Sequence, residues 1–287
     1  MQSEVVNTTA LARHTGIGHA MQALRAIVWR ELAKFSRQYG RLVSALVRPL
    51  LWLAVFAAGF RNVFGVAIVE PYDTYIPYDV YIAPGLVGMV LLFNGMQSSL
   101  AMVYDREMGL MRLLLTAPLP RAWILLSKLT ATAVLSLAQA AAFVIVAALL
   151  GTALPVFGPQ TLMVLLSAVC SALMLGSLGL LLSVHIKQLE NFAGTMNFVI
   201  FPMYFMSTAL YPLWKLEESG AEWVYRVAQF NPFTHAVEWM RFALYGKDPG
   251  IAPYVVLGTL AICFALASWG YDPQRGFGAL TKRGGPA

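Results

Sequence analysis

Charged residues are scarce in this sequence of 287 residues. Only 12% of them are Asp, Glu, Lys or Arg, whereas 59% are hydrophobic, and the mean hydropathy is +0.66. Soluble domains carry about 25% charged residues. The composition therefore excludes an ordinary soluble domain and indicates an integral membrane protein.

Cysteine and the common catalytic motifs are also rare or missing. The two cysteines, Cys170 and Cys263, lie singly in different apolar runs, so their spacing indicates neither a disulfide nor a metal site. The sequence holds no GxxxxGK[ST] phosphate loop, no HExxH, no GxSxG and no close His/Cys cluster. We therefore expect that this chain binds no metal and does not hydrolyse nucleotide by itself.

Six apolar runs are long enough to cross a bilayer, which takes about 20 residues in a helix. We predict an all-α, polytopic membrane protein that forms a single domain over 1–287. An N-terminal tail with an amphipathic helix occupies 1–41, the six-span part 42–270 and a second tail 271–287. The predicted spans are 44–64, 82–103, 124–150, 161–184, 193–212 and 251–270.

The basic residues are distributed unevenly between the two sides of these spans. If both termini are cytoplasmic, fifteen of the 20 Lys and Arg residues, Arg48 among them, belong to segments on the inner side. Lys and Arg in short loops are retained in the cytoplasm. The net charge of +6 is thus a topology signal rather than an indication of nucleic-acid binding, and we expect both termini inside.

Residues 21–39 show helical periodicity before the first span. Met21, Leu24, Val28, Leu32 and Phe35 recur on one face, and basic residues occupy the others. A basic amphipathic helix favours the membrane surface, where the polar face meets anionic headgroups. We expect an interfacial helix on the cytoplasmic surface; a helix packed on a soluble partner is the alternative.

The longest outer segment, 213–250, is too apolar for a plain loop. The stretches "GAEWVYRVAQF" and "NPFTHAVEWMRFALYG" each repeat apolar residues at helical spacing. Asn231 suits a helix N-cap and Pro232 suits a first turn. We predict two short helices that form a partly re-entrant hairpin in the outer leaflet.

A polar island separates the second and third spans on the inner side. It reads "YDREMGLMRLLLTAPLPRAWILLSKL" over 104–129. Its first part predicts a short helix with an apolar edge, which Pro118 and Pro120 terminate. Exposed Leu and Met beside mixed charge form a rigid surface that a cytoplasmic partner can hold in a groove.

This stretch, the later "NPFTHAVEWMRFALYG", the six spans and the basic amphipathic helix together resemble the type-2 permease subunits of ABC transporters. Relatives in that family export polysaccharides, nodulation factors and drugs. The resemblance covers nearly the whole chain. It implies a transmembrane permease subunit of an ATP-driven exporter in a bacterial inner membrane. A second permease subunit, as a homodimer or a heterodimer, and two copies of an ABC ATP-binding subunit that carries the ATP and Mg would complete it.

The resemblance also assigns roles to particular residues. The coupling helix that docks on the ATPase would include Asp105, Arg106, Glu107, Leu110, Met111, Arg112, Leu113 and Leu114. Spans two and five would line the pathway with Phe93, Asn94, Gln97, Asn197, Phe201, Tyr204 and Phe205. The outer gate would contain Trp223, Phe233, Glu238, Trp239 and Arg241. A purely structural role is the alternative for each pathway residue.

Two other classes of function remain open on the sequence alone. An ion-coupled secondary carrier usually places Asp, Glu or His inside its spans or repeats broken helices in two halves, and neither pattern is visible here. A membrane scaffold or membrane enzyme is the other alternative. The missing catalytic constellation argues against an enzyme.

Overall fold

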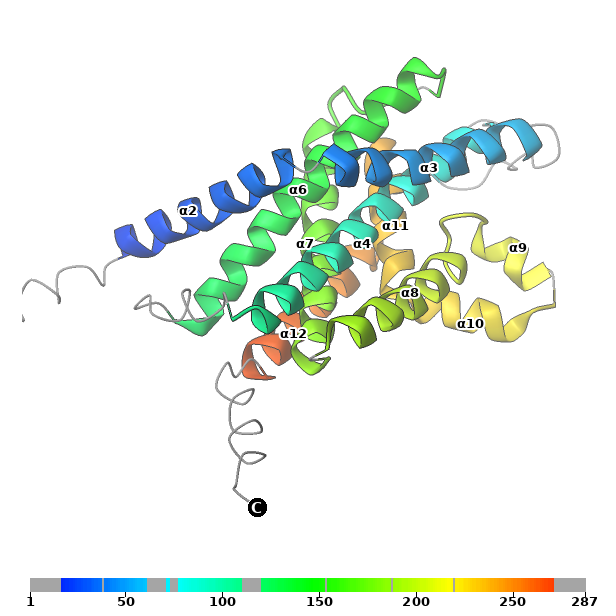
Figure 1. The fold of residues 1–287 in the computed structure, drawn as a ribbon. Helices are drawn as coiled ribbons and strands as arrows, with labels where there is room; N and C mark the ends of the chain where they lie inside the picture. The colour runs from blue at the N-terminus through cyan, green and yellow to red at the C-terminus, as the bar shows by residue number, and fades with distance from the viewer. Residues whose placement is uncertain are drawn as a thin grey trace, which may run out of the picture.

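The computed structural model of the chain describes residues 17–37, 39–60, 71–72, 77–109, 120–152, 154–186, 188–218 and 220–270. These residues form helices and no strand, in agreement with the predicted all-α class. The helices, which are coloured along the chain in Figure 1, are α2 (Ile17–Ser36), α3 (Tyr39–Phe60), α4 (Tyr78–Glu107), α6 (Arg121–Leu149), α7 (Thr161–His185), α8 (Leu189–Phe205), α9 (Leu213–Glu218), α10 (Glu222–Phe230), α11 (Pro232–Leu244) and α12 (Ala252–Gly270).

Four of the helices are long and apolar enough to cross a membrane: α4, α6, α7 and α12. The other two predicted spans correspond to α3 and α8, which do not meet that standard within the described residues. Helix α3 contains an arginine beside Pro49 in its first half, and α8 has 17 residues with Pro202 near its end. Helix α8 ends at Phe205 rather than at the expected 212, three residues after Pro202. The count of six spans stays a prediction.

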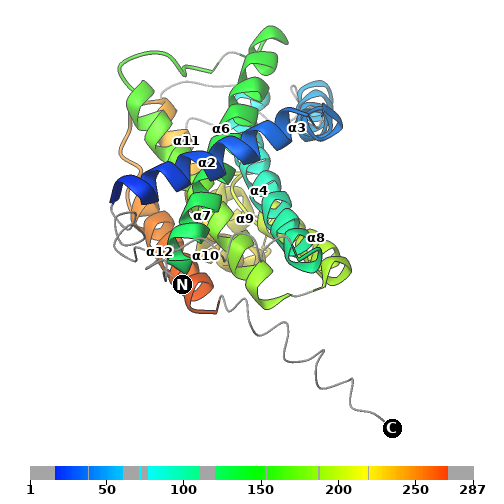
Figure 2. The ribbon, with the colours of Figure 1, turned by 60° about the vertical axis from the view of Figure 1, so that its left-hand side comes forward.

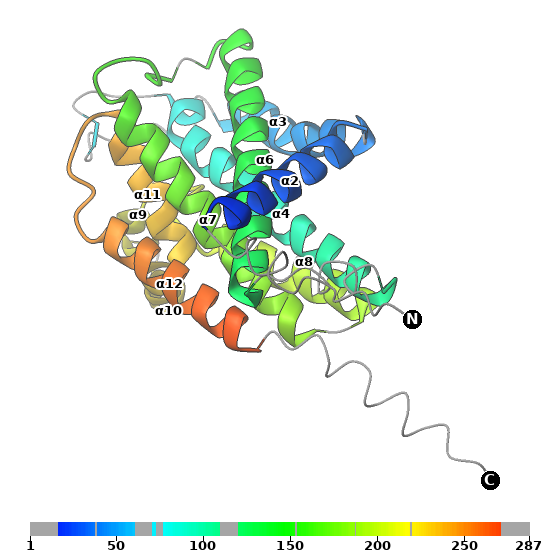
Figure 3. The same cartoon turned by 90° about the vertical axis from the view of Figure 1, so that its left-hand side faces the viewer.

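Helix α4 lies at the centre of the bundle, with α3, α6, α7, α8 and α11 around it (Figure 1). Its contact with α7 is unusually close, because small residues face one another there. A Cβ atom on Gly179 would lie 2.6 Å from Ser99 Oγ and 2.9 Å from the Gly95 carbonyl oxygen. Glycine therefore sets the separation of these two helices. Helix α12 runs along the edge of the bundle beside α7 and α11 (Figure 3).

The predicted amphipathic helix is observed as α2, which crosses α6 (Figure 2). Ile27 is buried, and Trp123 at the start of α6 donates its indole Nε1–H to the Ala20 carbonyl oxygen over 2.8 Å. Trp29 is 74% exposed on another face. One face of α2 is thus packed on the bundle, and its place on a membrane surface stays a prediction.

The segment after α8 contains three helices instead of the two that the sequence indicates. The additional short helix α9 packs against α10, whereas α11 packs into the bundle against α4, α7 and α12. The capping prediction is confirmed: Asn231 is the N-cap of α11, and Pro232 is its first residue. Helix α11 is the most apolar of the three, and its residues pack in the core. The hairpin therefore forms between α9 and α10.

Candidate functional site

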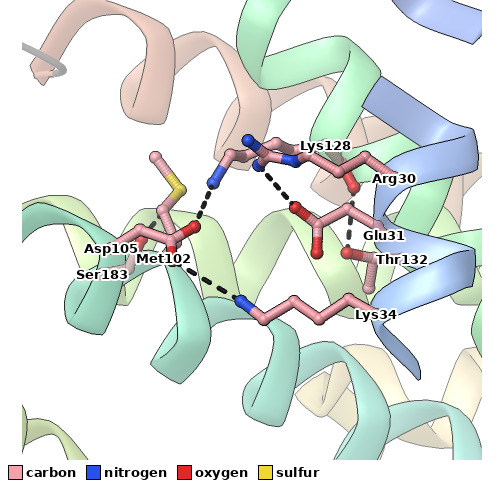
Figure 4. Close-up of polar contacts among 8 residues, drawn as sticks. All are labelled: Arg30, Glu31, Lys34, Met102, Asp105, Lys128, Thr132 and Ser183. Atoms are coloured by element: carbon pink, nitrogen blue, oxygen red, sulfur yellow. Dashed lines mark hydrogen bonds and ion pairs between the residues drawn. The ribbon is translucent and has the colours of Figure 1, made fainter. Parts of the chain in front are cut away.

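The last turn of α4 ends in a buried ion-pair cluster. Asp105 is 5% exposed, and its Oδ2 lies 3.3 Å from Lys128 Nζ of α6. Its Oδ1 lies 3.6 Å from Lys34 Nζ of α2. Figure 4 shows the two lysines converging on this carboxylate from different helices. A carboxylate pulled out of water needs such partners, so the cluster fixes α2 and α6 to this end of α4.

Glu31 of α2 joins the same region. It pairs with Arg30 over 2.9 Å and lines, together with Lys34, Asp105 and Lys128, a cavity of about 40 Å³. That is room for an ordered water among polar groups. We call Glu31, Lys34, Asp105 and Lys128 the α4-end cluster.

The next two residues of α4 hold the connection between α7 and α8. Arg106 donates from Nη2 to the Ile186 carbonyl oxygen at 2.8 Å, just past the end of α7. Glu107 Oε1 accepts the backbone N–H of Leu189, the first residue of α8, at 2.9 Å. A carboxylate at a helix N-terminus satisfies a free amide and is favoured by the helix dipole. The last turn of α4 therefore contacts α2, α6, α7 and α8.

The chain leaves α4 through Met108 and Gly109, and Gly109 has a φ of 72°, which suits glycine. The remaining residues of the predicted coupling helix, Leu110, Met111, Arg112, Leu113 and Leu114, lie outside the described residues.

Three of the predicted pathway residues form a row of aromatic rings. The centroids of Phe93 and Phe201 are 6.4 Å apart, and those of Phe201 and Phe205 are 6.2 Å apart. Trp52 of α3 extends the row, at 5.9 Å from Phe205. Phe201 is 43% exposed. This aromatic row, Phe93, Phe201, Phe205 and Trp52, thus joins α4, α8 and α3 along a partly open surface.

The other four pathway residues are divided between the core and the surface. Asn94 is buried and donates from Nδ2 to Ser136 Oγ at 3.1 Å, whereas Gln97 is partly exposed. Asn197 is exposed on α8. Tyr204 is fully buried and packs against Phe233 with ring centroids 6.0 Å apart. The contacts of Asn94 and Tyr204 are those of packed helices, as the structural alternative expects.

Arg48 was not among the predicted site residues, yet it lies at this surface. Its guanidinium carbon is 4.0 Å from the centroid of the Phe93 ring, near the middle of α4. Asn94, Gln97 and Gln139 line the same hollow. The sequence did contain an indication of this residue, because Arg48 lies four residues inside the expected first span. In the topology argument it was instead counted among the basic residues of the inner side.

The predicted outer-gate residues mostly face the core. Arg241 is 2% exposed, pairs with Glu238 and donates from Nη2 to the Thr208 carbonyl oxygen at 2.8 Å. Its guanidinium carbon lies 4.1 Å from the centroid of the Tyr81 ring, which ties α11 to α4. Among the gate residues, Phe233 and Trp239 are also buried. Trp223 of α10 is 62% exposed.

Burial sets the protonation of this region. Burial alone would lower the pKa of Arg241, but the adjacent Glu238 carboxylate raises it above the ordinary value. Burial also raises the pKa of Tyr72, whose ring lies 6.1 Å from Tyr81. The arginine is therefore charged and the phenol neutral across the physiological pH range. In the part of the chain that the structure describes, no three His, Cys, Asp or Glu residues gather as metal ligands would.

The long apolar helices, packed around a central helix with a buried charge cluster at one end, define a polytopic membrane protein. A family model for the ABC-2 type transporter matches residues 22–245. The chain therefore belongs to the ABC-2 transporter family, whose members are transport permeases rather than enzymes.

Curated relatives support this membership. A putative transport permease ycf38 of Cyanophora paradoxa is 31% identical over 230 residues, which cover 77% of this chain and 74% of the relative. The inner membrane transport permease YadH of Escherichia coli K12 is 24% identical over 259 residues, 89% of this chain and 96% of the relative. The daunorubicin resistance ABC transporter permease protein DrrB1 of Streptomyces coeruleorubidus is 22% identical over 252 residues, 85% and 83% of the two chains.

Proposed function

We propose that the chain is the permease subunit of an ATP-driven exporter. Two permease subunits form the substrate pathway, and two separate ATP-binding subunits supply ATP hydrolysis with Mg. The family membership supports a transport permease, and one relative is named as a permease of an ABC transporter. Export of the substrate and a homodimer are parts of the proposal.

The observation that carries this proposal is the set of contacts at the last turn of α4. The segment 110–119 follows directly, and in the proposal it docks on the ATP-binding subunit. Asp105 connects that turn to α2 and α6, while Arg106 and Glu107 connect it to α7 and α8. A displacement of the docked segment would therefore move four helices together. A partner can shift the equilibrium between two states only through contacts that differ between them.

The orientation belongs to the same proposal. The uneven distribution of basic residues supports an orientation with both termini and the segment 110–119 in the cytoplasm, and in the proposal the membrane is the bacterial inner membrane. The Tyr78 end of α4 then faces outwards, together with α9 and α10. Tyr78 supports this arrangement, since its hydroxyl donates to the Leu210 carbonyl oxygen at 2.7 Å, shortly before α9.

In the proposal, the substrate pathway runs along the aromatic row. Phe201 and Phe198 are 43% and 78% exposed on α8, so this face has no cover within the described chain. Two copies related by symmetry would turn these faces toward each other around a shared passage. The passage would suit amphiphilic molecules, because aromatic rings present large apolar surface.

Purification of the tagged chain in mild detergent from its native host tests the proposal. We expect native mass measurement to find two permease subunits with two ATP-binding subunits, and vesicles containing the complex to transport only with ATP. A monomer that transports without any ATPase would contradict the proposal and favour the ion-coupled carrier.

A further inference from the structure

The Arg48 guanidinium lies beside the middle of α4, the central helix of the bundle and one of those long enough to cross a membrane. Helix α3 begins at Tyr39, so Arg48 lies about 13 Å along it at 1.5 Å per residue. Its guanidinium contacts the ring of Phe93, which is near the middle of the 30-residue helix α4. An arginine at this depth is costly, and in membrane proteins such residues face a cavity or a functional partner.

No carboxylate on the protein compensates this charge within the described ranges; the contact recorded for its guanidinium is the Phe93 ring. The Arg48 residue is exposed, and it stands at the rim of a hollow between α3, α4 and α6. The cation is therefore accessible from the open face of the aromatic row.

The hollow also contains an unused hydrogen-bond acceptor. Gln139 of α6 is 3% exposed, and its Oε1 has no partner. Burying such an acceptor without a donor is unfavourable. The space, about 10 Å³, admits a single water-sized group such as one hydroxyl or one phosphate oxygen. A ligand that reaches both Arg48 and Gln139 would combine an anionic oxygen for the guanidinium with a small hydrogen-bond donor for Oε1, and a hydroxyl is a donor of that size.

The apolar part of such a ligand has a surface beside the cation. Phe93 contacts both Arg48 and Phe201, and the row continues to Phe205 and Trp52. An alkyl or aromatic group lying on these rings would keep its anionic head at Arg48.

We propose that Arg48 and Gln139 form a headgroup site for the transported molecule, and that this molecule is an anionic, hydroxylated amphiphile such as a lysophospholipid-like phosphate ester. The anionic oxygen pairs with the Arg48 guanidinium, a hydroxyl donates to Gln139 Oε1, and the apolar chain lies along the aromatic row. This inference rests on the proposed function, since it names the substrate class of that pathway.

Equilibrium binding to the purified permease in phosphatidylcholine nanodiscs, without nucleotide, tests the site separately from ATP coupling. The probes are lauroyl lysophosphatidic acid, which has a glycerol hydroxyl, and dodecyl phosphate, which has no alcohol hydroxyl. Both are measured at about pH 8.5, where the phosphate oxygens carry no proton. Empty nanodiscs correct for partitioning. We expect Arg48→Gln to weaken binding of both probes by about tenfold or more, because a charge-assisted contact is lost. Gln139→Leu should weaken only the hydroxylated probe.

Arg226→Gln is the matched control, since Arg226 also lines an apolar hollow but is paired with Glu222 and is exposed. It should change neither affinity by more than about twofold. Phosphatidylglycerol added to the nanodiscs separates the sources: competition identifies a bilayer lipid as the anion, and its absence identifies another solute of the same chemistry.

Three outcomes would overturn the inference. The first is unchanged binding of both probes by Arg48→Gln. The second is equal competition by dodecyltrimethylammonium, which would mean that the site does not distinguish an anion from a cation. The third is loss of the permease dimer in Arg48→Gln by native mass measurement, which would make Arg48 a subunit contact. A failure to find an ATP-binding partner would instead contradict the proposed function and leave these binding results unaffected.

Discussion

Lys128 Nζ lies 3.3 Å from Asp105 Oδ2, and both side chains are less than 10% exposed. This pair joins the beginning of the chain's third predicted span to the residues just after the second. Removing one member leaves the other charge buried, which typically costs about 3 to 5 kcal/mol, whereas apolar replacement of both is often nearly neutral.

We therefore expect Asp105→Asn to lower the free energy of unfolding by about 3 kcal/mol or more. The double variant Asp105→Leu/Lys128→Met should recover to within about 1 kcal/mol of the native chain. Lys34→Met is the control and should cost about 1 kcal/mol or less, because its side chain is 40% exposed. Denaturant unfolding in detergent measures the free energy of unfolding of each variant. Additive effects in the double variant would show that Asp105 and Lys128 are not coupled.

Glu107 tests the connection between α4 and α8. Glu107→Gln keeps an oxygen that accepts the Leu189 N–H, so we expect it to retain most of the stimulation of the partner's ATPase activity. Glu107→Ala and Glu107→Lys remove the acceptor and should abolish that stimulation, while membrane insertion stays normal.

Glu218→Lys serves as the comparison, since Glu218 is exposed and its ion pair is with Lys215 on the same helix. It should be mild. If Glu107→Gln were as defective as Glu107→Lys, the negative charge itself would matter, as in direct contact with the ATP-binding subunit.

Asn231 both starts α11 and holds the end of α8. Its Oδ1 accepts the Phe233 N–H at 3.0 Å, and its Nδ2 donates to the Met203 and Met206 carbonyl oxygens at 2.7 and 2.8 Å. Asn231→Asp keeps the cap but faces those carbonyls with a charge. We expect it to destabilise the protein by about 1 to 3 kcal/mol in thermal unfolding assays. A native-like Asp variant would mean that the cap alone matters there.

Gly179 is a test of the α4–α7 contact. Its added methyl group would meet Ser99 and the Gly95 backbone at less than 3 Å, so Gly179→Ala must push the helices apart at a cost of about 1 to 3 kcal/mol. Gly194 in α8 has nothing within 4 Å of such a methyl group. Gly194→Ala should leave stability unchanged or raise it by about 1 kcal/mol. Equal melting temperatures for the two variants would contradict the close packing.

Thiol labelling in intact cells measures the orientation. Cys170 and Cys263 are buried, so the background is low. We expect Met108→Cys to be protected from a membrane-impermeant maleimide and Trp223→Cys to react, since the two positions are 58% and 62% exposed and lie on opposite sides in the proposed topology. The reverse pattern would invert the orientation.

The sequence was most informative where one physical rule acts alone. Hydropathy located α4, α6, α7 and α12, and the Asn-Pro pair at 231–232 located the start of α11, because a cap is a local requirement. The sequence was less informative where contacts between packed helices determine the structure. The end of α8 and the pairing of α9 with α10 depend on how the helices pack against one another in the bundle.

The candidate site shows the same division. Charge in the stretch after Met102 was recognisable, but the roles of Asp105, Arg106 and Glu107 depend on partners 23 to 82 residues away. Arg48 was missed because a basic residue near a span end usually follows the topology rule. Its contact with Phe93 exists only once α3 and α4 pack together.

The residues of the α4-end cluster are synthesised at different times. During synthesis Lys34 is made long before Asp105, but Lys128 follows by 23 residues, an interval of about 1 to 5 seconds at translation rates. Through that interval the carboxylate has only its more exposed lysine partner. A nascent chain whose α6 fails to insert therefore keeps the Asp105 carboxylate without the more buried of its two lysine partners.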